Sequence, residues 1–387
     1  MTRAESRYSL GARLLNTPFS LTSATGGTSL PHKFTYSSAG VDRKLRANSK
    51  KALDCLKKTY GYSHYGKVVS LPYGKILPWE DCYFDLVIEG VGTKVLVAQL
   101  AEKYDTIGID GVAMAVNDVI RSGARPLAIA DNIHAQVSDP ALISQLMEGI
   151  VKGAAEAECV VPSGEIGDVA ELIKGLTQGK GFDLVFASIG IAAKEKVIYG
   201  RNIKPGDVIV GMPSSGLHSN GMSLARRVLL KQWGGKYQAT TVPDGLEREV
   251  VDEILEPTKI YVKPFLGIAE EVKVKAAINI TGDAYLKFNR LEEFSGKIGF
   301  EFDNFKPQPI FNLIQKTATD LGGTITEEEM FRTFNMGWGF AVIVDKEDSE
   351  RTINVLKKTG TQAEQIGHVR ATEGVKILYK NRKIALK

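Results

Sequence analysis

A loop rich in hydroxyl and amide side chains, Pro213–Gly221, carries the clearest potential for phosphate chemistry in this sequence. It follows an apolar segment at 207–212 that is typical of a strand, and it precedes a helical pattern at 222–230. A loop between a strand and a helix directs backbone N–H groups and the helix N-terminus toward an anion. The same residue types also serve as ordinary turn and cap residues. The candidate phosphate-binding residues of this loop are Ser215, Gly216, Ser219 and Asn220.

A second group of such residues follows the apolar segment 84–89, which predicts a short strand ending at Glu89. A carboxylate is a hard ligand suited to Mg²⁺, glycine lets the backbone approach a ligand closely, and lysine offers a positive charge to phosphate. The spacing is not that of the P-loop, which has four residues between its glycines. The candidate nucleotide-binding residues here are Gly90, Gly92, Thr93 and Lys94.

Further carboxylates lie in the predicted helix 110–122 and in the glycine-containing segment 162–168. Asp118 interrupts an otherwise apolar run, and a carboxylate in such surroundings usually pairs with a cation or a metal because burying it alone is costly. A position on the solvated edge of the helix is the alternative. Glu165 lies in a predicted turn before a helix, where either metal ligation or backbone capping would suit it.

The elements that must position these residues alternate between strand and helix, which predicts an α/β or α+β fold. A glycine- and proline-containing segment at 194–207 is the best domain boundary. We therefore expect a flexible extension at 1–34, an N-terminal domain at 35–196 and a C-terminal domain at 197–387. The predicted strands are 84–89, 127–130, 182–192, 208–212, 276–280 and 340–344, with an edge strand at 377–387. The predicted helices are 41–59, 95–102, 110–122, 142–157, 222–231, 247–255, 310–321, 327–331 and 350–359.

The composition excludes several classes of protein. The 387 residues carry a net charge of only +4 and have no dense basic stripe, which argues against a nucleic-acid partner. No apolar run reaches the roughly 18 residues of a membrane helix, and no signal peptide is visible. The three cysteines are widely spaced, which fits a reducing compartment rather than a disulfide framework. We therefore expect a cytoplasmic protein without a membrane partner.

Taken in order, the motifs resemble those of the aminoimidazole ribonucleotide synthetase family, also called the phosphoribosylformylglycinamidine cyclo-ligases of purine biosynthesis. The resemblance covers nearly everything from Tyr36 to the C-terminus. The matching segments are Tyr36–Asp42, Glu89–Lys94, Tyr104–Asp118, Pro213–Gly221, Pro257–Val262 and Thr333–Gly339.

The resemblance implies a two-domain α/β architecture. In it, a small N-terminal sheet pairs with that of a second subunit to form the barrel-like core of a homodimer, and a larger C-terminal α/β domain packs alongside. The implied reaction is ATP-dependent ring closure of formylglycinamidine ribonucleotide, with Mg²⁺ as the expected metal. ATP phosphorylates the formamide oxygen, the amidine nitrogen attacks the activated carbon, and phosphate leaves. Catalysis of this kind depends mainly on positioning and charge neutralisation.

The resemblance also assigns roles to individual residues. Glu89 takes the place of a family aspartate and, with Asp118, would ligate Mg²⁺, whereas Thr93 and Lys94 match the phosphate-binding end of the same motif. His218 is expected to transfer a proton or contact phosphate, so His218, Lys94 and Asp118 are the candidate catalytic residues. Two loops, 163–168 and 282–284, depart from the family pattern. The departure leaves Glu165 as the least secure metal ligand and the substrate contacts near residue 283 open.

Two alternatives compete with this interpretation. Another ATP-using enzyme of the same superfamily would act on a different amide-like substrate. Selenophosphate synthetase would need a reactive cysteine in its N-terminal loop, and a hydrogenase maturation factor would need one at its C-terminus, and this sequence has neither. A catalytically silent nucleotide-binding protein is disfavoured because the charged and polar positions of the motifs are retained.

Overall fold

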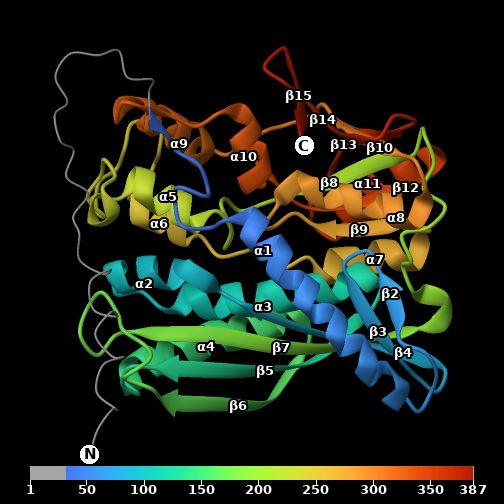
Figure 1. The fold of residues 1–387 in the computed structure, drawn as a ribbon, viewed down its shortest axis with the longest axis horizontal. Coiled ribbons are helices and arrows are strands. Elements are labelled where there is room, and N and C mark those ends of the chain that lie inside the picture. The colour runs from blue at the N-terminus through green and yellow to red at the C-terminus, as the bar shows by residue number, and fades with distance from the viewer. Residues whose placement is uncertain (1–31, 387) are drawn as a thin grey trace, which may run out of the picture.

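The computed structural model describes residues 32–386, which form two halves that each contain a β-sheet (Figure 1). The expected extension lies outside this range up to residue 31. The N-terminal half holds a six-stranded sheet in the order β2-β3-β4-β7-β5-β6, antiparallel except between β5 and β6. Its strands are β2 (Val69–Leu71), β3 (Gly74–Trp79), β4 (Cys82–Gly90), β5 (Arg125–Ala135), β6 (Val160–Asp168) and β7 (Phe182–Ala193).

Helices cover only one face of this sheet. They are α2 (Val95–Ala101), α3 (Asp105–Val119) and α4 (Pro140–Ala157), with 3-10 turns at Gly92–Lys94 and Ile120–Ser122. The contact between α3 and the sheet is so close that a Cβ at Gly111 would lie 1.8 Å from the Phe186 ring, so only glycine fits there. The opposite face carries large exposed apolar side chains, and Leu86 and Ile88 of β4 are each 71% exposed. Leu77, Trp79 and Val160 belong to the same exposed set.

The C-terminal half holds a seven-stranded sheet in the order β15-β14-β10-β13-β8-β12-β9. Its strands are β8 (Val208–Pro213), β9 (Ala276–Asn279), β10 (Gly299–Phe302), β12 (Trp338–Val344), β13 (Glu364–Arg370), β14 (Gly374–Tyr379) and β15 (Arg382–Leu386). Its helices are α5 (Met222–Leu229), α6 (Val250–Leu255), α7 (Val262–Glu271), α8 (Glu292–Ser295), α9 (Pro309–Asp320), α10 (Glu327–Thr333) and α11 (Ser349–Lys358). The 3-10 segments of this half are η5 (Lys231–Trp233), η6 (Ala284–Leu291) and η7 (Lys346–Asp348), whereas η4 (Lys194–Lys196) directly follows β7.

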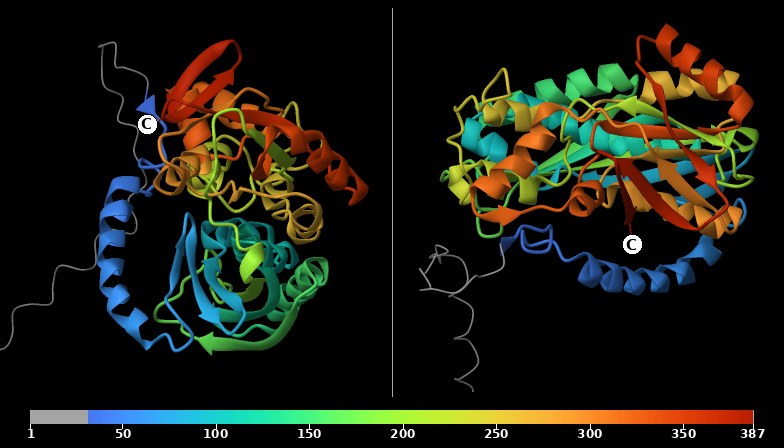
Figure 2. Two further views of the ribbon diagram at one scale, coloured as in Figure 1. Left: turned by 90° about the vertical axis from the view of Figure 1, so that its right-hand side faces the viewer. Right: turned by 90° about the horizontal axis from the view of Figure 1, so that it is seen from above.

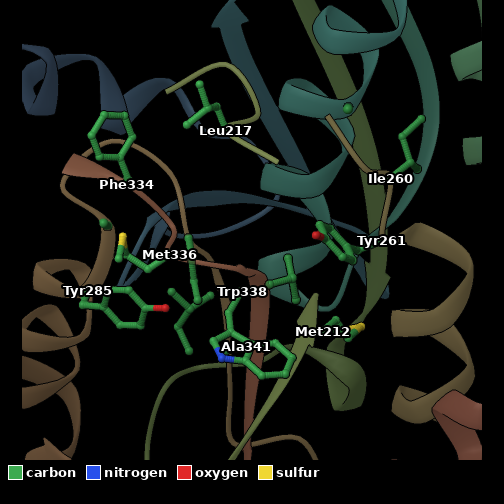
Figure 3. Close-up of a cluster of buried hydrophobic side chains, with 14 of the residues drawn as sticks. Met212, Leu217, Ile260, Tyr261, Tyr285, Phe334, Met336, Trp338 and Ala341 are labelled. Atoms are coloured by element: carbon green, nitrogen blue, oxygen red, sulfur yellow. The ribbon is translucent and has the colours of Figure 1, made fainter. Parts of the chain in front are cut away.

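Every residue of β12 is buried, and the surrounding cluster supports the polar loop that begins at Pro213 (Figure 3). Two tyrosines in this cluster direct their hydroxyls to backbone carbonyls. Tyr261 donates to the carbonyl of Pro213 at 2.9 Å, and Tyr285 donates to that of Asn335 at 2.8 Å. Buried tyrosines are normally satisfied in this way, and here the bonds fix the positions of two loop segments.

The segment that precedes the N-terminal sheet crosses between the two halves. It starts with β1 (His32–Lys33), which pairs in parallel with β11 (Gly323–Thr324) of the C-terminal half. It continues through α1 (Arg43–Lys50) and the 3-10 helix η1 (Lys51–Tyr62), which stand along one side of the molecule (Figure 2). Neither helix has a buried residue. We call α1 and η1 together the strap.

Most of the predicted elements are confirmed within a few residues, including a helix that begins near residue 41 and changes to 3-10 geometry at Lys51. The predicted turn at 162–168 is wrong, because these residues form most of the strand β6. Pro162 suggested a turn, yet proline is tolerated at the edge of a sheet, which is where β6 lies. The predicted edge strand at 377–387 is confirmed only in part, because residues 377–379 are the end of β14 and a turn follows them. The edge strand is β15, which pairs antiparallel with β14. No helix in residues 32–386 has the length and apolarity that crossing a membrane requires.

Candidate active site

A pocket of about 570 Å³ lies between the two halves and beneath the strap. It is lined by residues of α1, β3, β4, α3, α5, β9 and η6. Of the residues predicted from sequence, the structure brings seven to this pocket. They are Glu89, Gly90, Gly92, Thr93, Asp118, Ser219 and Asn220.

Glu89 and Asp118 form a pair of carboxylates on the wall of this pocket. Glu89 comes from the inner face of β4, and Asp118 from the last turn of α3 above it. Asp118 is held by the Arg121 guanidinium at 2.6 Å and by the side-chain amide of Asn279 at 2.8 Å. Burial, and then the charge of Asp118, raises the pKa of Glu89 to about 7. A bound cation would relieve the repulsion between the two carboxylates.

Lys287 and Asp85 complete the charged wall around this pair. Lys287 lies on η6, is buried, and donates to the carbonyl of Asn279 at 3.0 Å and to the hydroxyl of Thr281. Burial lowers the pKa of its ammonium to about 8, opposed by the charge of Asp118. Burial also raises the pKa of Asp85 to about 6. Two groups on this wall, Glu89 and Lys287, thus titrate near neutral pH.

The polar loop reaches the pocket only with its last residues. Ser219 and Asn220 line the pocket, whereas Ser215 and Gly216 do not. The Ser215 hydroxyl donates to the Pro257 carbonyl, and the Gly216 carbonyl accepts from the Asn335 side chain. Asn335 holds the loop in place: its amide donates to the Gly216 carbonyl at 2.8 Å and its carbonyl accepts from the Ser214 hydroxyl at 3.0 Å. Next to the loop, the hydroxyls of Thr93 and Ser223 lie 3.3 Å apart on the pocket wall.

His218 is fully buried beneath the loop and does not line the pocket. Its Nε2 accepts from the backbone N–H of Ser215 at 3.2 Å, and its Nδ1 has no partner among the described residues. Burial, followed by the charges of Lys94 and Lys259, lowers the pKa of His218 to about 3. The imidazole is therefore neutral at physiological pH and orients the loop backbone from below, and its predicted proton-transfer role stays a prediction.

Lys94 is also outside the pocket, although its neighbour Thr93 lines it. Its ammonium lies 2.7 Å from a carboxylate oxygen of Asp110 and donates to the Glu256 carbonyl at 2.7 Å. Asp110 accepts a further bond from the backbone N–H of Thr258 at 2.8 Å. The structure therefore places Lys94 in a buried ion pair that also bonds to the C-terminal half, and its predicted phosphate-binding role stays a prediction.

Glu165 lies on the edge strand β6, away from Glu89 and Asp118. The pairing of β6, β5, β7 and β4 places Glu165 in one row with Gly90, on the face opposite Glu89. This face is the exposed apolar one, so within a single chain Glu165 does not join the carboxylate pair. Its metal-binding role stays a prediction.

Loop 282–284 retains a glycine-like backbone although its residues differ from the family pattern. Asp283 and Ala284 have φ angles of 69° and 40°, in the region that favours glycine. Asp283 lies 3.6 Å from the Arg43 guanidinium at the start of α1. The changed loop therefore contacts the strap while still lining the pocket.

Sequence reasoning missed the basic residues of the pocket. All but Lys75 of β3 lie in short helical segments, and which face of each segment meets the pocket depends on the tertiary structure. These pocket-lining residues are Arg46, Lys50, Lys75, Arg121, Lys287 and Arg290.

The carboxylate pair suits Mg²⁺ in its chemistry. Residues 32–386 contain no cluster of three or more His, Cys, Asp or Glu side chains able to hold a metal. Mg²⁺ is, however, commonly bound through one or two carboxylates together with waters and substrate phosphates. Glu89 and Asp118, with an elevated pKa on Glu89, fit that pattern.

Comparison with known proteins agrees with the two-part architecture. Residues 79–192 match the family described as AIR synthase related protein, N-terminal domain, and residues 204–380 match the corresponding C-terminal domain. A Pyrococcus horikoshii protein named phosphoribosylformylglycinamidine cyclo-ligase is 38% identical over 328 residues, covering 84% of this chain and 92% of the relative. A Methanocaldococcus jannaschii protein of the same name is 38% identical over 341 residues, covering 87% of this chain and 92% of the relative.

Solved structures share the fold at low sequence identity. The hydrogenase maturation protein HypE superposes with a TM-score of 0.56 at 15% identity, covering 85% of this chain and 92% of that one. A T. maritima PurL solved with FGAR superposes with a TM-score of 0.54 at 18% identity, covering 84% of this chain but only 47% of the longer PurL chain. At these identities the likeness concerns the fold.

Proposed function

The chain belongs to the AIR synthase related family, in which its curated relatives are phosphoribosylformylglycinamidine cyclo-ligases, and on that premise we propose that the pocket beneath the strap is its active site. The protein is an ATP-dependent ligase that closes formylglycinamidine ribonucleotide to aminoimidazole ribonucleotide in purine biosynthesis. The competing interpretation, an enzyme acting on another amide-like substrate, has less support, because four relatives that each cover 84–89% of this chain share this one name.

The observation that carries the assignment of the site is the carboxylate pair of Glu89 and Asp118 within a pocket that also contains basic residues. Phosphoryl transfer from ATP to a formamide oxygen requires negative charge to be neutralised on the transferring group while the two reactants are held in line. Mg²⁺, if held by Glu89 and Asp118, would neutralise phosphate oxygens. Lys287, buried beside this pair, adds a positive charge that does not depend on a metal.

The polar loop and its neighbours would bind and orient the nucleotide. Gly90 and Gly92 allow the backbone to approach the phosphates, and the hydroxyls of Thr93, Ser219 and Ser223 together with the amide of Asn220 supply hydrogen bonds. His218 acts through the loop: its neutral imidazole holds the Ser215 backbone, so it is a positioning residue in this scheme.

A homodimer is the assembly that best accounts for the bare face of the N-terminal sheet. A soluble monomer seldom exposes large adjacent apolar side chains such as Leu86, Ile88 and Trp79. A second copy of the same face would cover them by twofold symmetry. Glu165 would then lie within the interface. A cytoplasmic location stays a prediction.

The activity is tested with purified protein, ATP, Mg²⁺ and formylglycinamidine ribonucleotide, following phosphate and aminoimidazole ribonucleotide in one reaction. We expect one phosphate released per imidazole formed, and no product without Mg²⁺. Release of phosphate without imidazole would contradict the substrate assignment and favour another amide-like substrate.

A further inference from the structure

Two pairs of basic residues from distant parts of the chain line the pocket. Arg46 and Lys50 come from α1 in the strap, and Lys287 and Arg290 come from η6 in the C-terminal half. These segments are more than 200 positions apart in the chain, so the fold alone brings the four charges together. A cluster of this kind requires an explanation, because like charges repel.

The spacing places each pair on one face of its helix. Arg46 and Lys50 are four residues apart in an α-helix, and Lys287 and Arg290 are three apart in a 3-10 helix, where side chains at that spacing eclipse. Like charges at these spacings destabilise a helix. Helix stability therefore gives no reason for either pair.

Lys287 is satisfied by neighbouring acceptors, but the other three are not. Within residues 32–386, Arg46, Lys50 and Arg290 make no ion pair and no side-chain hydrogen bond. The contrast with Arg43, one turn earlier on α1, is informative: its guanidinium lies 3.2 Å from Glu329 and 3.6 Å from Asp283. Arg43 fixes the start of the strap, and the next two basic residues along this pocket are left for a ligand.

The lowered pKa of Lys50 indicates that Arg46, Lys50 and Arg290 lie close together. Partial burial, and then the positive charges of Arg46 and Arg290, lowers the pKa of Lys50, while the carboxylates of Asp283 and Glu89 raise it to a smaller extent. The positive charge of these three groups contrasts with the carboxylate pair of Glu89 and Asp118 in the same pocket. The three cations and the carboxylate pair therefore suit different ligands.

The chemistry of the carboxylate pair and that of the three cations indicate different ligands. A carboxylate pair binds polyphosphate through a metal ion. Two guanidinium groups and an ammonium bind a compact dianion directly, because guanidinium groups match phosphate oxygens in pairs of parallel hydrogen bonds. A phosphate monoester is such a dianion, and the ribonucleotide substrate of the proposed function carries one.

We propose that Arg46, Lys50 and Arg290 form the subsite for the phosphate monoester of the ribonucleotide substrate, with the strap supplying two of its three cations. The identity of the substrate rests on the proposed function, whereas the preference for a phosphate monoester rests on the three unpaired side chains. A metal-bound triphosphate of ATP would instead be held at Glu89 and Asp118.

Direct binding tests the subsite without relying on turnover. Isothermal titration calorimetry compares ribose 5-phosphate with ribose on the full-length protein and on the variants Arg46→Gln, Lys50→Met and Arg290→Gln. All three side chains are exposed, so the variants are expected to fold. Lys44→Met, which removes an equally exposed charge from α1 outside the pocket lining, is the matched control.

We expect the wild type and Lys44→Met to bind ribose 5-phosphate and not ribose, with each of the three variants weakening binding by about tenfold or more, as for a lost charged hydrogen bond. Unchanged binding of ribose 5-phosphate to all three variants would overturn the proposal.

Kinetics then distinguish the two possible sources of phosphate. In the cyclo-ligase assay the variants should raise KM for the ribonucleotide and leave KM for ATP unchanged, and a rise in KM for ATP alone would reassign the cluster to the triphosphate. If no imidazole forms with the wild type but the variants still lose ribose 5-phosphate binding, the subsite stands and the proposed function fails.

Discussion

The ammonium of Lys94 lies 2.7 Å from the carboxylate of Asp110, and neither side chain is exposed to solvent. The pair links the turn after β4 to α3, and through the Glu256 carbonyl it reaches the C-terminal half. A lysine that the sequence motif assigns to phosphate is thus part of the contact between the halves.

This arrangement predicts that Lys94→Met acts on stability. Removing one partner of a buried pair leaves the other charge uncompensated and typically costs about 3–5 kcal/mol. We expect that loss in the free energy of unfolding measured with urea, and a smaller loss for the double variant Lys94→Met/Asp110→Leu than for the sum of the single changes. A Lys94→Met protein of normal stability with a large rise in KM for ATP would instead return Lys94 to the phosphate site.

Asp118→Asn is expected to impair the use of Mg²⁺. The substitution keeps the shape of the side chain but removes one of two carboxylates, so the Mg²⁺ concentration for half-maximal turnover should rise by about 100-fold or more, beyond the loss typical of an outer-shell change. Asp244→Asn, an exposed carboxylate outside the pocket lining, serves as the control. Unaltered Mg²⁺ dependence in Asp118→Asn would exclude it as a ligand.

His218 should make the folded state sensitive to acid. Its pKa is lowered to about 3 in the folded protein, while an unfolded histidine titrates near 6.5. The unfolded state therefore takes up the proton first, and the stability associated with a neutral His218 is complete above pH 6.5 and is lost as the pH falls toward 3. Between pH 7 and pH 5 this amounts to about 2 kcal/mol.

The measurement compares urea unfolding of wild type and His218→Gln at pH 7 and pH 5. Other groups contribute equally to both proteins, so the wild type should lose about 2 kcal/mol more than the variant over this interval. Equal losses would show that His218 is not buried in its neutral form. In addition, no pKa of His218 should appear in the pH dependence of turnover between pH 5 and pH 8.

The apolar face of the N-terminal sheet predicts a dimer that a single pair of charges can disrupt. Leu86→Asp with Ile88→Asp places two carboxylates on the surface a second copy would cover. We expect a dimeric wild type and a monomeric variant in light scattering after size-exclusion chromatography. Leu172→Asp changes a side chain that is 83% exposed outside that sheet, and it should remain dimeric. A monomeric wild type would remove the basis for the dimer.

Structural features could be predicted from the sequence where neighbouring residues determine them, and not where distant residues do. The strand, loop and helix around residue 218 were predictable, because apolar runs and glycines mark such junctions within about 25 residues. The strand β6 was not, because its proline and glycines are turn signals unless the edge position is known.

Among the site residues, the same distinction separates what was found from what was missed. Glu89 and Asp118 stood out as carboxylates in apolar surroundings, and the structure brings both to the pocket. The burial of Lys94 depends on Asp110 and on a carbonyl 162 positions away. Arg46 and Arg290 line the same pocket only because the strap crosses between the two halves, and no local sequence pattern predicts that crossing.

The crossing of the strap between the halves determines which residues belong to each half. The C-terminal half includes β1, which pairs with Gly323 and Thr324, and the contact of Arg43 with Glu329, so it is built from two separate stretches of the chain. A fragment beginning at residue 197 would lack both contacts. The two halves therefore cannot be exchanged independently. A chimera with a relative, joined at residues 194–207, would preserve the pocket only if the strap and the C-terminal surface that it contacts came from the same protein.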